Sequence, residues 1–257
     1  MITTDIHAHI LPGVDDGPES LDESLRLAKA FLEVGTGRVV ATPHVNQRWG
    51  VRPEGVIDSY RSLVAALKSA SINLSIEQGG ELELATAVEL SNEELDVFRI
   101  ASGEWILIEP PSSGPSTSVH GMIYQIQSRG YRVIIAHPER CQTFQQDIAL
   151  LQSLVAGGAM TQVTAGSLTG EFGRTAEKFS RRLLGLGLVH AMSADAHDTR
   201  LRSPGILKHL SQSGFEWLYG WLCQEIPEMI ITGGAEPTRP SAPARGTGWR
   251  RILRGQS

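Results

Sequence analysis

The side chains with the clearest chemical potential are histidines and carboxylates near the ends of apolar segments. His7 and His9 stand one residue apart in TDIHAHILPGVDDG, and the alternation of a β-strand would put both imidazoles on one face. Two aspartates follow, and spacing alone does not separate Asp15 from Asp16; we choose Asp16 as the ligand candidate. The later candidates each close an apolar segment: His44, Glu81, Glu109, His137, Asp195 and His197.

These nine side chains are metal-ligand types, and they exceed the four ligands that one tetrahedral ion takes. Mixed imidazole and carboxylate sets suit Mn, Fe or Zn, often in clusters that carboxylates bridge. Without cations, so many carboxylates would repel one another and lose hydration at substantial cost. The pattern therefore predicts a centre with several metal ions. His120, His190 and His209 fit no such position, and we expect structural roles for them, two in helices and His190 in a strand.

Two arginines accompany the candidate ligands. Arg140 follows His137 in AHPER, and Arg202 lies five residues after His197. A planar guanidinium group suits bidentate binding of phosphate oxygens. Beside a metal cluster, this pair indicates metal-assisted hydrolysis of a phosphoester.

The elements that must position these residues alternate along the chain. Strands are predicted near residues 3–10, 38–44, 74–84, 105–111, 132–140, 160–168 and 188–197, and helices over 20–35 and 53–70 and near 119–129, 145–156, 174–186 and 204–212. Repeated β-then-α units favour parallel strands, and about seven units without a break favour a closed α/β barrel over an open sheet. The candidates then share the rim formed by the C-terminal strand ends, where such barrels carry their active sites.

Helix signals accompany the first two helical segments. Ser20 and Glu23 form the pattern of a capping box at the start of the first. We expect its buried stripe to be Leu21, Leu25, Ala28 and Leu32, and that of the second helix to be Ile57, Tyr60, Val64 and Leu67.

Composition narrows the function classes. The net charge is −5, but residues 236–257 hold five Arg and one Glu (+4), so residues 1–235 sum to −9. An acidic main domain argues against nucleic acid as a partner. We expect a single domain over 1–235 and a flexible basic tail over 236–257, whose arginines and Trp249 could contact a membrane or a partner weakly. Two cysteines, no membrane-spanning run and no signal sequence predict a cytoplasmic protein.

The motifs resemble those of the PHP (polymerase and histidinol phosphatase) superfamily, in particular the bacterial manganese-dependent tyrosine-protein phosphatases of capsule and exopolysaccharide synthesis. The stretches that carry the resemblance are DIHAHILPGVDDGP, ATPHV, GGELEL, LIEPP, IAHPERC, QVTAGSLTGEFG and SADAHD. The resemblance implies a distorted (β/α)7 barrel, a site for three Mn²⁺ ions held by the nine candidates, and Arg140 and Arg202 at the substrate phosphate. Two departures are Thr164, where the family pattern leads us to expect asparagine, and the RLRSP segment around Arg202.

The resemblance also implies a substrate and a mechanism. A metal-bound hydroxide would attack the phosphoryl group of a phosphotyrosine protein, which the resemblance identifies as a membrane-associated bacterial tyrosine autokinase that controls capsule synthesis. The two arginines would neutralise phosphoryl charge, and His44 or Asp195 is a candidate general acid whose assignment stays open. Association into a homo-oligomer also stays open.

Several alternatives are weighed against this function. Cysteine-dependent tyrosine phosphatases need a Cys-x5-Arg loop, whereas the sixth residue after Cys141 is Asp147 and that after Cys223 is Met229. Cys141 is therefore interpreted as a packing residue. The same metal centre acting on a small phosphate monoester such as histidinol phosphate, or on a nucleic-acid end, is the nearest enzymatic alternative. A non-catalytic, metal-bound regulator of a membrane kinase is the alternative from another class.

Overall fold

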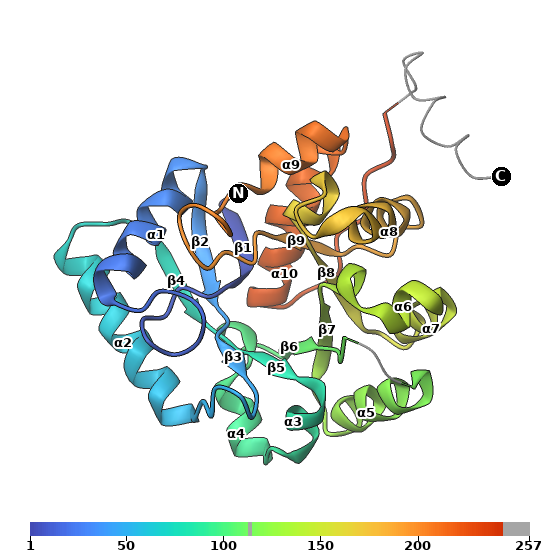
Figure 1. Cartoon of the computed structure of the whole chain (residues 1–257), viewed down its shortest axis with the longest axis horizontal. Coiled ribbons are helices and arrows are strands. Elements are labelled where there is room, and N and C mark those ends of the chain that lie inside the picture. The colour runs from blue at the N-terminus through green and yellow to red at the C-terminus, as the bar shows by residue number, and fades with distance from the viewer. Residues whose placement is uncertain (113–114, 244–257) are drawn as a thin grey trace.

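Parallel strands form the wall of a barrel in the computed structural model, which describes residues 1–112 and 115–243 (Figure 1). In chain order the strands are β1 (Thr3–Ala8), β2 (Thr36–Ala41), β3 (His44–Val45), β4 (Ser75–Gln78), β5 (Glu81–Glu83), β6 (Trp105–Glu109), β7 (Arg132–Ala136), β8 (Met160–Thr164) and β9 (Ala191–Ser193). They pair in the orders β1-β2-β4 and β3-β5-β6-β7-β8-β9. A parallel bridge between Ala8 and Ala196, with the His9 N–H donating to the Ala196 carbonyl at 2.9 Å, brings the end of β1 against the segment after β9.

Two of the predicted strands are interrupted. The expected strand 38–44 breaks at Thr42 and Pro43 into β2 and β3, because proline has no N–H to donate to a neighbouring strand. The expected strand 74–84 breaks at two glycines into β4 and β5. A Cβ at Gly80 would lie 2.8 Å from the Phe98 ring, so the chain can pass there only without a side chain. Counting each broken strand once leaves seven strand positions, which is the number predicted.

Helices lie on the outside of the barrel and connect most of its strand positions (Figure 1). They are α1 (Leu21–Glu33), α2 (Pro53–Ser69), α3 (Leu84–Glu89), α4 (Asn92–Val97), α5 (Ser116–Ser128), α6 (Gln142–Gln146), α7 (Ile148–Ala156), α8 (Gly173–Gly185), α9 (Ile206–Ser213) and α10 (Ile226–Thr232). Shorter 3₁₀ turns are η1 (Ile100–Ser102), η2 (Pro138–Arg140), η3 (Ala165–Thr169) and η4 (Glu216–Leu218), and η5 (Trp221–Glu225) is a π-helical turn. The longer helices confirm the expected helical segments.

The buried face of α1 differs from the predicted stripe. Ser24, Leu27, Ala28 and Phe31 are buried, whereas Leu32 is 36% exposed. Apolar residues lie on more than one side of this helix, and the bulky Phe31 ring decides which side faces the barrel. The Ser24 hydroxyl is accommodated there because it can donate to the Ser20 carbonyl at 3.4 Å.

The same error of about one position occurs in α2. Val56, Leu63 and Leu67 are buried there, and Val64, which was predicted to be buried, is 40% exposed. Tyr60 is half-buried because its hydroxyl reaches out to donate to the Ile76 carbonyl at 3.1 Å. Helical spacing thus identified both helices and placed Ala28 and Leu67 correctly in the core, but it did not give the whole buried face of either helix.

The capping box at α1 is formed only in part. The Ser20 side chain accepts from the Glu23 N–H, as predicted, but the Glu23 carboxylate accepts from the N–H of Glu19 instead of that of Ser20. His190 also departs from its prediction, because it lies one residue before β9 instead of within a strand.

The chain beyond α10 contacts the barrel over part of its length. The Trp221 indole donates to the Pro237 carbonyl at 3.0 Å, and Arg239 donates to the Leu184 carbonyl at 2.7 Å. Residues 244–257, with most of the arginines of the predicted tail, lie outside the described residues, so the division at 235 stays a prediction. Among the helices that the structure describes, none combines the length and apolar character needed to cross a membrane.

Candidate metal centre

All nine ligand candidates gather at one rim of the barrel, where β1, β6, β7 and β9 end and where the short strands β3 and β5 follow β2 and β4. His7 lies in β1, His44 opens β3, Glu81 opens β5 and Glu109 closes β6. The other five lie in the segments that follow β1, β7 and β9: His9, Asp16, His137, Asp195 and His197. Strand ends from all round the barrel therefore converge on one place, as the β-then-α pattern predicts.

The Glu81 carboxylate lies at the middle of the cluster and is 1% exposed. Its Oε2 lies 3.3 Å from both His7 Nε2 and His9 Nε2 and 3.0 Å from His44 Nδ1. Its Oε1 lies 2.6 Å from His137 Nε2. One carboxylate thus faces four imidazoles, which is the arrangement of a bridging metal ligand.

The nine side chains form four overlapping groups with metal-site spacing, and within each group the ligand atoms lie within 4.8 Å of one another. The groups are His9, Asp16, His44 and His197; His7, His9 and Asp195; His7, Glu81 and His137; and His44, Glu81 and Glu109. In the part of the chain that the structure describes, no residue outside the nine candidates belongs to such a group.

Asp15 and Asp16, which spacing does not separate, take different positions in the structure. Asp16 Oδ1 lies 3.5 Å from His44 Nε2 and 3.3 Å from His197 Nε2, inside the cluster. Asp15 lies behind it and accepts from His9 Nδ1 at 2.6 Å and from the His44 N–H at 2.9 Å. Asp15 therefore orients His9 and is not itself among the grouped ligands.

A second orienting residue is Gln162 on β8, which the sequence analysis did not single out. Its Oε1 lies 2.8 Å from His7 Nδ1. An amide oxygen can only accept, so His7 Nδ1 is the donor of this bond, and Nε2 is the ring nitrogen turned toward Glu81. Such partners behind a ligating histidine fix its tautomer and ring orientation.

Two ligand candidates have unusual backbone conformations. His137 has φ of 30° and Asp195 has φ of 54°, in the left-handed region that non-glycine residues rarely adopt. Strain of this kind concentrates at functional sites, where the surrounding structure enforces a particular side-chain direction. Here it aims both side chains into the rim.

The carboxylates of the cluster have opposed pKa shifts. Burial and the adjacent Glu81 carboxylate raise the pKa of Glu109 to about 7. Burial also opposes ionisation of Glu81, but the charge of His7 and the hydrogen bond with His137 hold the pKa of Glu81 well below the usual range. Two neighbouring carboxylates that resist joint ionisation are a donor set that a divalent cation would stabilise.

Three buried polar atoms without hydrogen-bond partners also indicate that the cluster suits metal ions. Glu81 Oε2, Asp195 Oδ1 and His44 Nδ1 are buried without a hydrogen-bond partner among the described residues. Leaving such atoms unsatisfied costs about 1–3 kcal/mol each, more for charged groups. All three face the centre of the cluster, so the residues present fit metal ions bound there.

Arg140 and Arg202 meet on a single carboxylate. Their Nη2 atoms lie 2.5 and 2.6 Å from Asp195 Oδ2, and Arg202 Nη1 also donates to His197 Nε2 at 2.8 Å. The Phe172 ring lies beneath both guanidinium groups, with centroid distances of 4.6 Å to Arg140 and 6.0 Å to Arg202. The Nε atoms of both arginines are buried without a partner in the described structure, so each retains a donor for an anion.

Thr164 and Glu139 support Arg140 from behind. Thr164 Oγ1 accepts from Arg140 Nη2 at 3.3 Å. The buried Glu139 carboxylate accepts from the Thr164 N–H at 3.1 Å and from the Ser167 hydroxyl at 2.7 Å. Position 164, where the sequence departs from the expected asparagine, is therefore in contact with Arg140.

The remaining histidines and the cysteines lie apart from the cluster. His120 is in α5, and His209 is in α9, where its Nδ1 pairs with Thr169 Oγ1 at 2.8 Å. Cys141 is buried, its thiol donates to the Pro111 carbonyl at 3.1 Å, and burial raises its pKa. A thiol with a raised pKa is a poor nucleophile, in agreement with the packing role predicted for Cys141.

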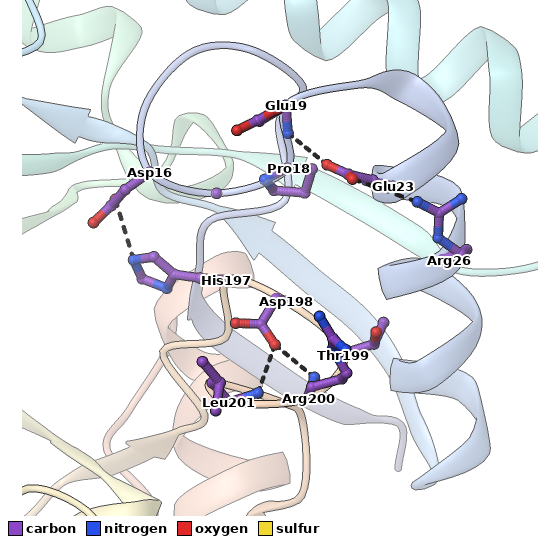
Figure 2. Close-up of a pocket in the computed structure, with 11 residues that line it drawn as sticks. Asp16, Pro18, Glu19, Glu23, Arg26, His197, Asp198, Thr199, Arg200 and Leu201 are labelled. Carbon is purple, nitrogen blue, oxygen red and sulfur yellow. Dashed lines mark hydrogen bonds and ion pairs between the residues drawn. The ribbon is translucent and has the colours of Figure 1, made fainter.

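A cleft of about 540 Å³ opens beside the cluster and shares Asp16 and His197 with it (Figure 2). One wall comes from residues 16–19 and the start of α1, and the other from residues 197–201 (Figure 2). The rim thus combines a buried polar centre with an adjoining open cleft.

Comparison with known proteins gives concordant results. Residues 3–214 match the family model described as capsular polysaccharide synthesis, CpsB/CapC. The chain is 35% identical over 202 residues to the tyrosine-protein phosphatase YwqE of Bacillus subtilis, covering 77% of this chain and 79% of the relative. It is 34% identical over 207 residues to the CapC protein of Staphylococcus aureus, covering 80% and 81%.

A solved structure is similar over nearly the whole chain. It comes from work on YwqE of Bacillus subtilis and CpsB of Streptococcus pneumoniae, described as metal-dependent tyrosine phosphatases. The match has a TM-score of 0.82 and 31% identity, and covers 95% of this chain and all of the other.

Proposed function

Because this chain belongs to the CpsB/CapC family of capsular polysaccharide synthesis, we propose that it is a metal-dependent protein-tyrosine phosphatase. The observation that carries the proposal is the combination of four overlapping ligand groups with two arginines held on Asp195, one of the grouped carboxylates. A cation site and an anion site that share a carboxylate suit a phosphoryl group placed between them.

The nine grouped side chains are the ones that would hold the metal. When bound, divalent cations supply Lewis acidity, lower the pKa of water and offset charge on phosphoryl oxygens. We assign three Mn²⁺ ions to the site, with Fe or Zn as substitutes. The count of three ions follows from the family resemblance, and Glu81, whose two oxygens face different imidazoles, would be placed to serve more than one ion.

Arg140 and Arg202 bind the phosphoryl group in this proposal. Asp195 fixes one nitrogen of each guanidinium group, and their buried Nε–H groups remain to donate to phosphoryl oxygens. Because the two arginines are already held before substrate arrives, less side-chain entropy is lost on binding. The hydrolysis needs no covalent enzyme intermediate, in keeping with the buried and protonated Cys141 thiol.

The leaving group places a small demand on acid catalysis. Tyrosine leaves as a phenol with a pKa of about 10, so a weak acid suffices. His44 and Asp195 are the candidates, and the exposed fraction of the His44 side chain, 16% against 1% for Asp195, favours His44 as the group that can reach a departing phenolate.

The physiological substrate in this proposal is a phosphotyrosine protein, specifically a membrane-associated bacterial tyrosine kinase of capsule synthesis. The family model names that pathway, and the related YwqE is named a tyrosine-protein phosphatase. A cytoplasmic location is a further prediction from the sequence, and association into a homo-oligomer stays open.

The proposal is tested by comparing substrates on one preparation loaded with Mn²⁺. We expect hydrolysis of phosphotyrosine peptides at a kcat/KM well above that for histidinol phosphate, and no cleavage of single-stranded DNA. A preference for histidinol phosphate would make the chain a small-molecule phosphatase. Metal binding without hydrolysis of any of the three would make it a regulator.

A further inference from the structure

The turn from His197 to Arg202 is held in one conformation by its own hydrogen bonds. Asp198 Oδ1 accepts from the N–H groups of Arg200 at 2.5 Å and Leu201 at 2.6 Å, and its Oδ2 accepts from the Arg202 N–H at 3.3 Å. The N–H groups of His197 and Asp198 both donate to the Arg202 carbonyl, at 2.8 and 3.2 Å. The side chains on this turn are therefore presented in fixed directions.

This turn has an inner and an outer side. Arg202 and His197 point inward, where they meet Asp195 and Asp16. Arg200 and Leu201 lie on the outer side and line the adjoining cleft. Leu201 is 88% exposed, the largest exposed fraction among the large hydrophobic residues of the described chain. The turn therefore offers an exposed apolar side chain, Leu201, beside the metal centre.

Some of the charged side chains that line the cleft already have partners within the protein, and others do not. Glu23 accepts from the Glu19 N–H at 2.8 Å and lies 3.5 Å from Arg26, and Asp198 is used by the turn (Figure 2). Arg200 is exposed and forms no ion pair within the described residues, so its charge is available to a ligand.

The lining as a whole disfavours a polyanion. Asp16 belongs to the metal centre, and among the other charged groups of the lining three carboxylates, those of Glu19, Glu23 and Asp198, stand against the guanidinium groups of Arg26 and Arg200. A nucleic-acid backbone or an anionic membrane would be repelled by this net negative charge. A polypeptide, which can match separate charges and apolar contacts one by one, fits the mixed lining.

We propose that this cleft binds the polypeptide that flanks the phosphotyrosine of a protein substrate, with an acidic residue of the substrate at Arg200 and an apolar residue on Leu201. The inference rests on the proposed phosphatase function, because the cleft begins at Asp16 and His197 of the metal centre. Its volume, about 540 Å³, is within the usual range of ligand clefts.

One rigid turn then serves both recognition and chemistry. Its inner side holds an arginine of the phosphoryl site, and its outer side reads the neighbouring residues. Glu19 on the opposite wall repels an acidic residue there, which restricts the acidic side chain to the wall that carries Arg200.

The test compares a peptide with a small substrate on the same holoenzyme. The peptides carry one phosphotyrosine, one leucine and one glutamate scanned from three residues before the phosphotyrosine to three after it, and p-nitrophenyl phosphate reports the metal centre alone. The variants are Arg200→Glu and Leu201→Ser. The matched controls, Arg182→Glu and Leu186→Ser, alter exposed residues near the end of α8, at the opposite end of the barrel.

We expect one glutamate position to be preferred by the wild-type enzyme, and Arg200→Glu to lower kcat/KM for that peptide by about 3- to 10-fold. Placing lysine at that position should restore activity to Arg200→Glu. Leu201→Ser should lower the same constant by about 3-fold. Hydrolysis of p-nitrophenyl phosphate should change by less than about twofold, and both controls should match the wild type.

Equal losses with both substrates would overturn the inference, because they would mean that the turn itself had been disturbed. An unchanged peptide preference in both variants would also overturn it, since the cleft would then not touch the substrate. A wild-type enzyme inactive on every phosphotyrosine substrate, including p-nitrophenyl phosphate, would contradict the phosphatase function and this inference with it.

Discussion

His137 and His190 are alike in burial and in acidity, but the structure uses them differently. Each is 8% exposed, and the pKa of each is lowered to about 4 by burial and by a nearby arginine, Arg140 for one and Arg239 for the other. His137 Nε2 lies 2.6 Å from Glu81, whose other oxygen has no hydrogen-bond partner. His190 Nδ1 instead accepts from the Thr161 N–H at 3.1 Å, so this ring nitrogen already has a partner in the backbone.

The difference shows that burial alone does not mark a histidine as a metal ligand. The rim histidines His7 and His9 have an acceptor behind one ring nitrogen, while the other faces a carboxylate shared with further imidazoles. His190 is a buried neutral ring with a partner in the backbone. The predictions below test this distinction, from the largest effect to the smallest.

Removing the rim histidine His137 should abolish catalysis, whereas altering His190 should not. We expect His137→Ala to lower kcat for phosphotyrosine peptide by on the order of 1,000-fold and to reduce the bound metal, because a ligand contributes more than its outer partner. His190→Asn, which keeps an acceptor for the Thr161 N–H, should stay within about twofold of the wild type. Equal losses in the two variants would show that burial, and not metal ligation, explains both.

Removing the acceptor behind His7 should have an intermediate effect. Gln162→Met keeps the size of the side chain but loses the oxygen, and we expect metal affinity to fall about 10- to 100-fold. Gln162→Glu keeps an oxygen acceptor and should retain more affinity than Gln162→Met. The matched control is Gln78→Met on β4, where the lost bond goes only to the Val97 carbonyl. Titration of the metal-free protein with Mn²⁺ measures the affinity, and equal values for Gln162→Met and wild type would refute the orienting role.

His190 should make the stability of the protein sensitive to acid. The unfolded imidazole titrates near 6.5 and the folded one near 4, so between these values the unfolded state binds more protons and stability falls as pH falls. Between pH 7 and pH 5, the wild type should lose about 2 kcal/mol of its free energy of unfolding through this group, and His190→Asn should not show this loss. Urea unfolding of both metal-loaded proteins at the two pH values measures the difference. Identical pH dependence in the two proteins would mean that His190 is not buried as a neutral ring.

The smallest expected effect concerns Thr164. Thr164→Val removes the acceptor for Arg140 and should raise KM for phosphotyrosine peptide by about 3- to 10-fold, with little change in kcat. Thr164→Asn supplies an amide oxygen and should recover the wild-type KM. Thr161→Val, at the other end of β8, removes a hydroxyl that donates to Leu188 and should leave KM unchanged. A KM that does not change in Thr164→Val would show that this contact does not position the arginine.

The sequence was sufficient to predict the nine grouped side chains because the same β-then-α unit recurs along the chain. Each strand of a parallel barrel ends at the same face, so polar residues at successive strand ends must meet. The positions of two supporting residues could also have been inferred. Gln162 and Thr164 are two residues apart on β8, so their side chains point to the same side of the strand. Phe172 could not, because the loop before α8 carries no period that shows where its ring lies.

The errors have a common physical cause. The buried faces of α1 and α2 were displaced because both helices carry apolar residues on more than one stripe, and contacts with the barrel decide between them. The breaks before β3 and β5 depend on Pro43 and on the closeness of Phe98 to Gly80, and the second of these is a contact distant in sequence. Local patterns predict which elements form, whereas the side that each presents is a tertiary property.

The most direct test of the metal-centre account is a titration of the metal-free protein with Mn²⁺, in which bound metal and hydrolysis of a phosphotyrosine peptide are measured on the same samples. The account predicts no activity without metal, and activity that rises with occupancy and saturates at three ions per chain. Full activity in the chelated, metal-free protein would contradict it.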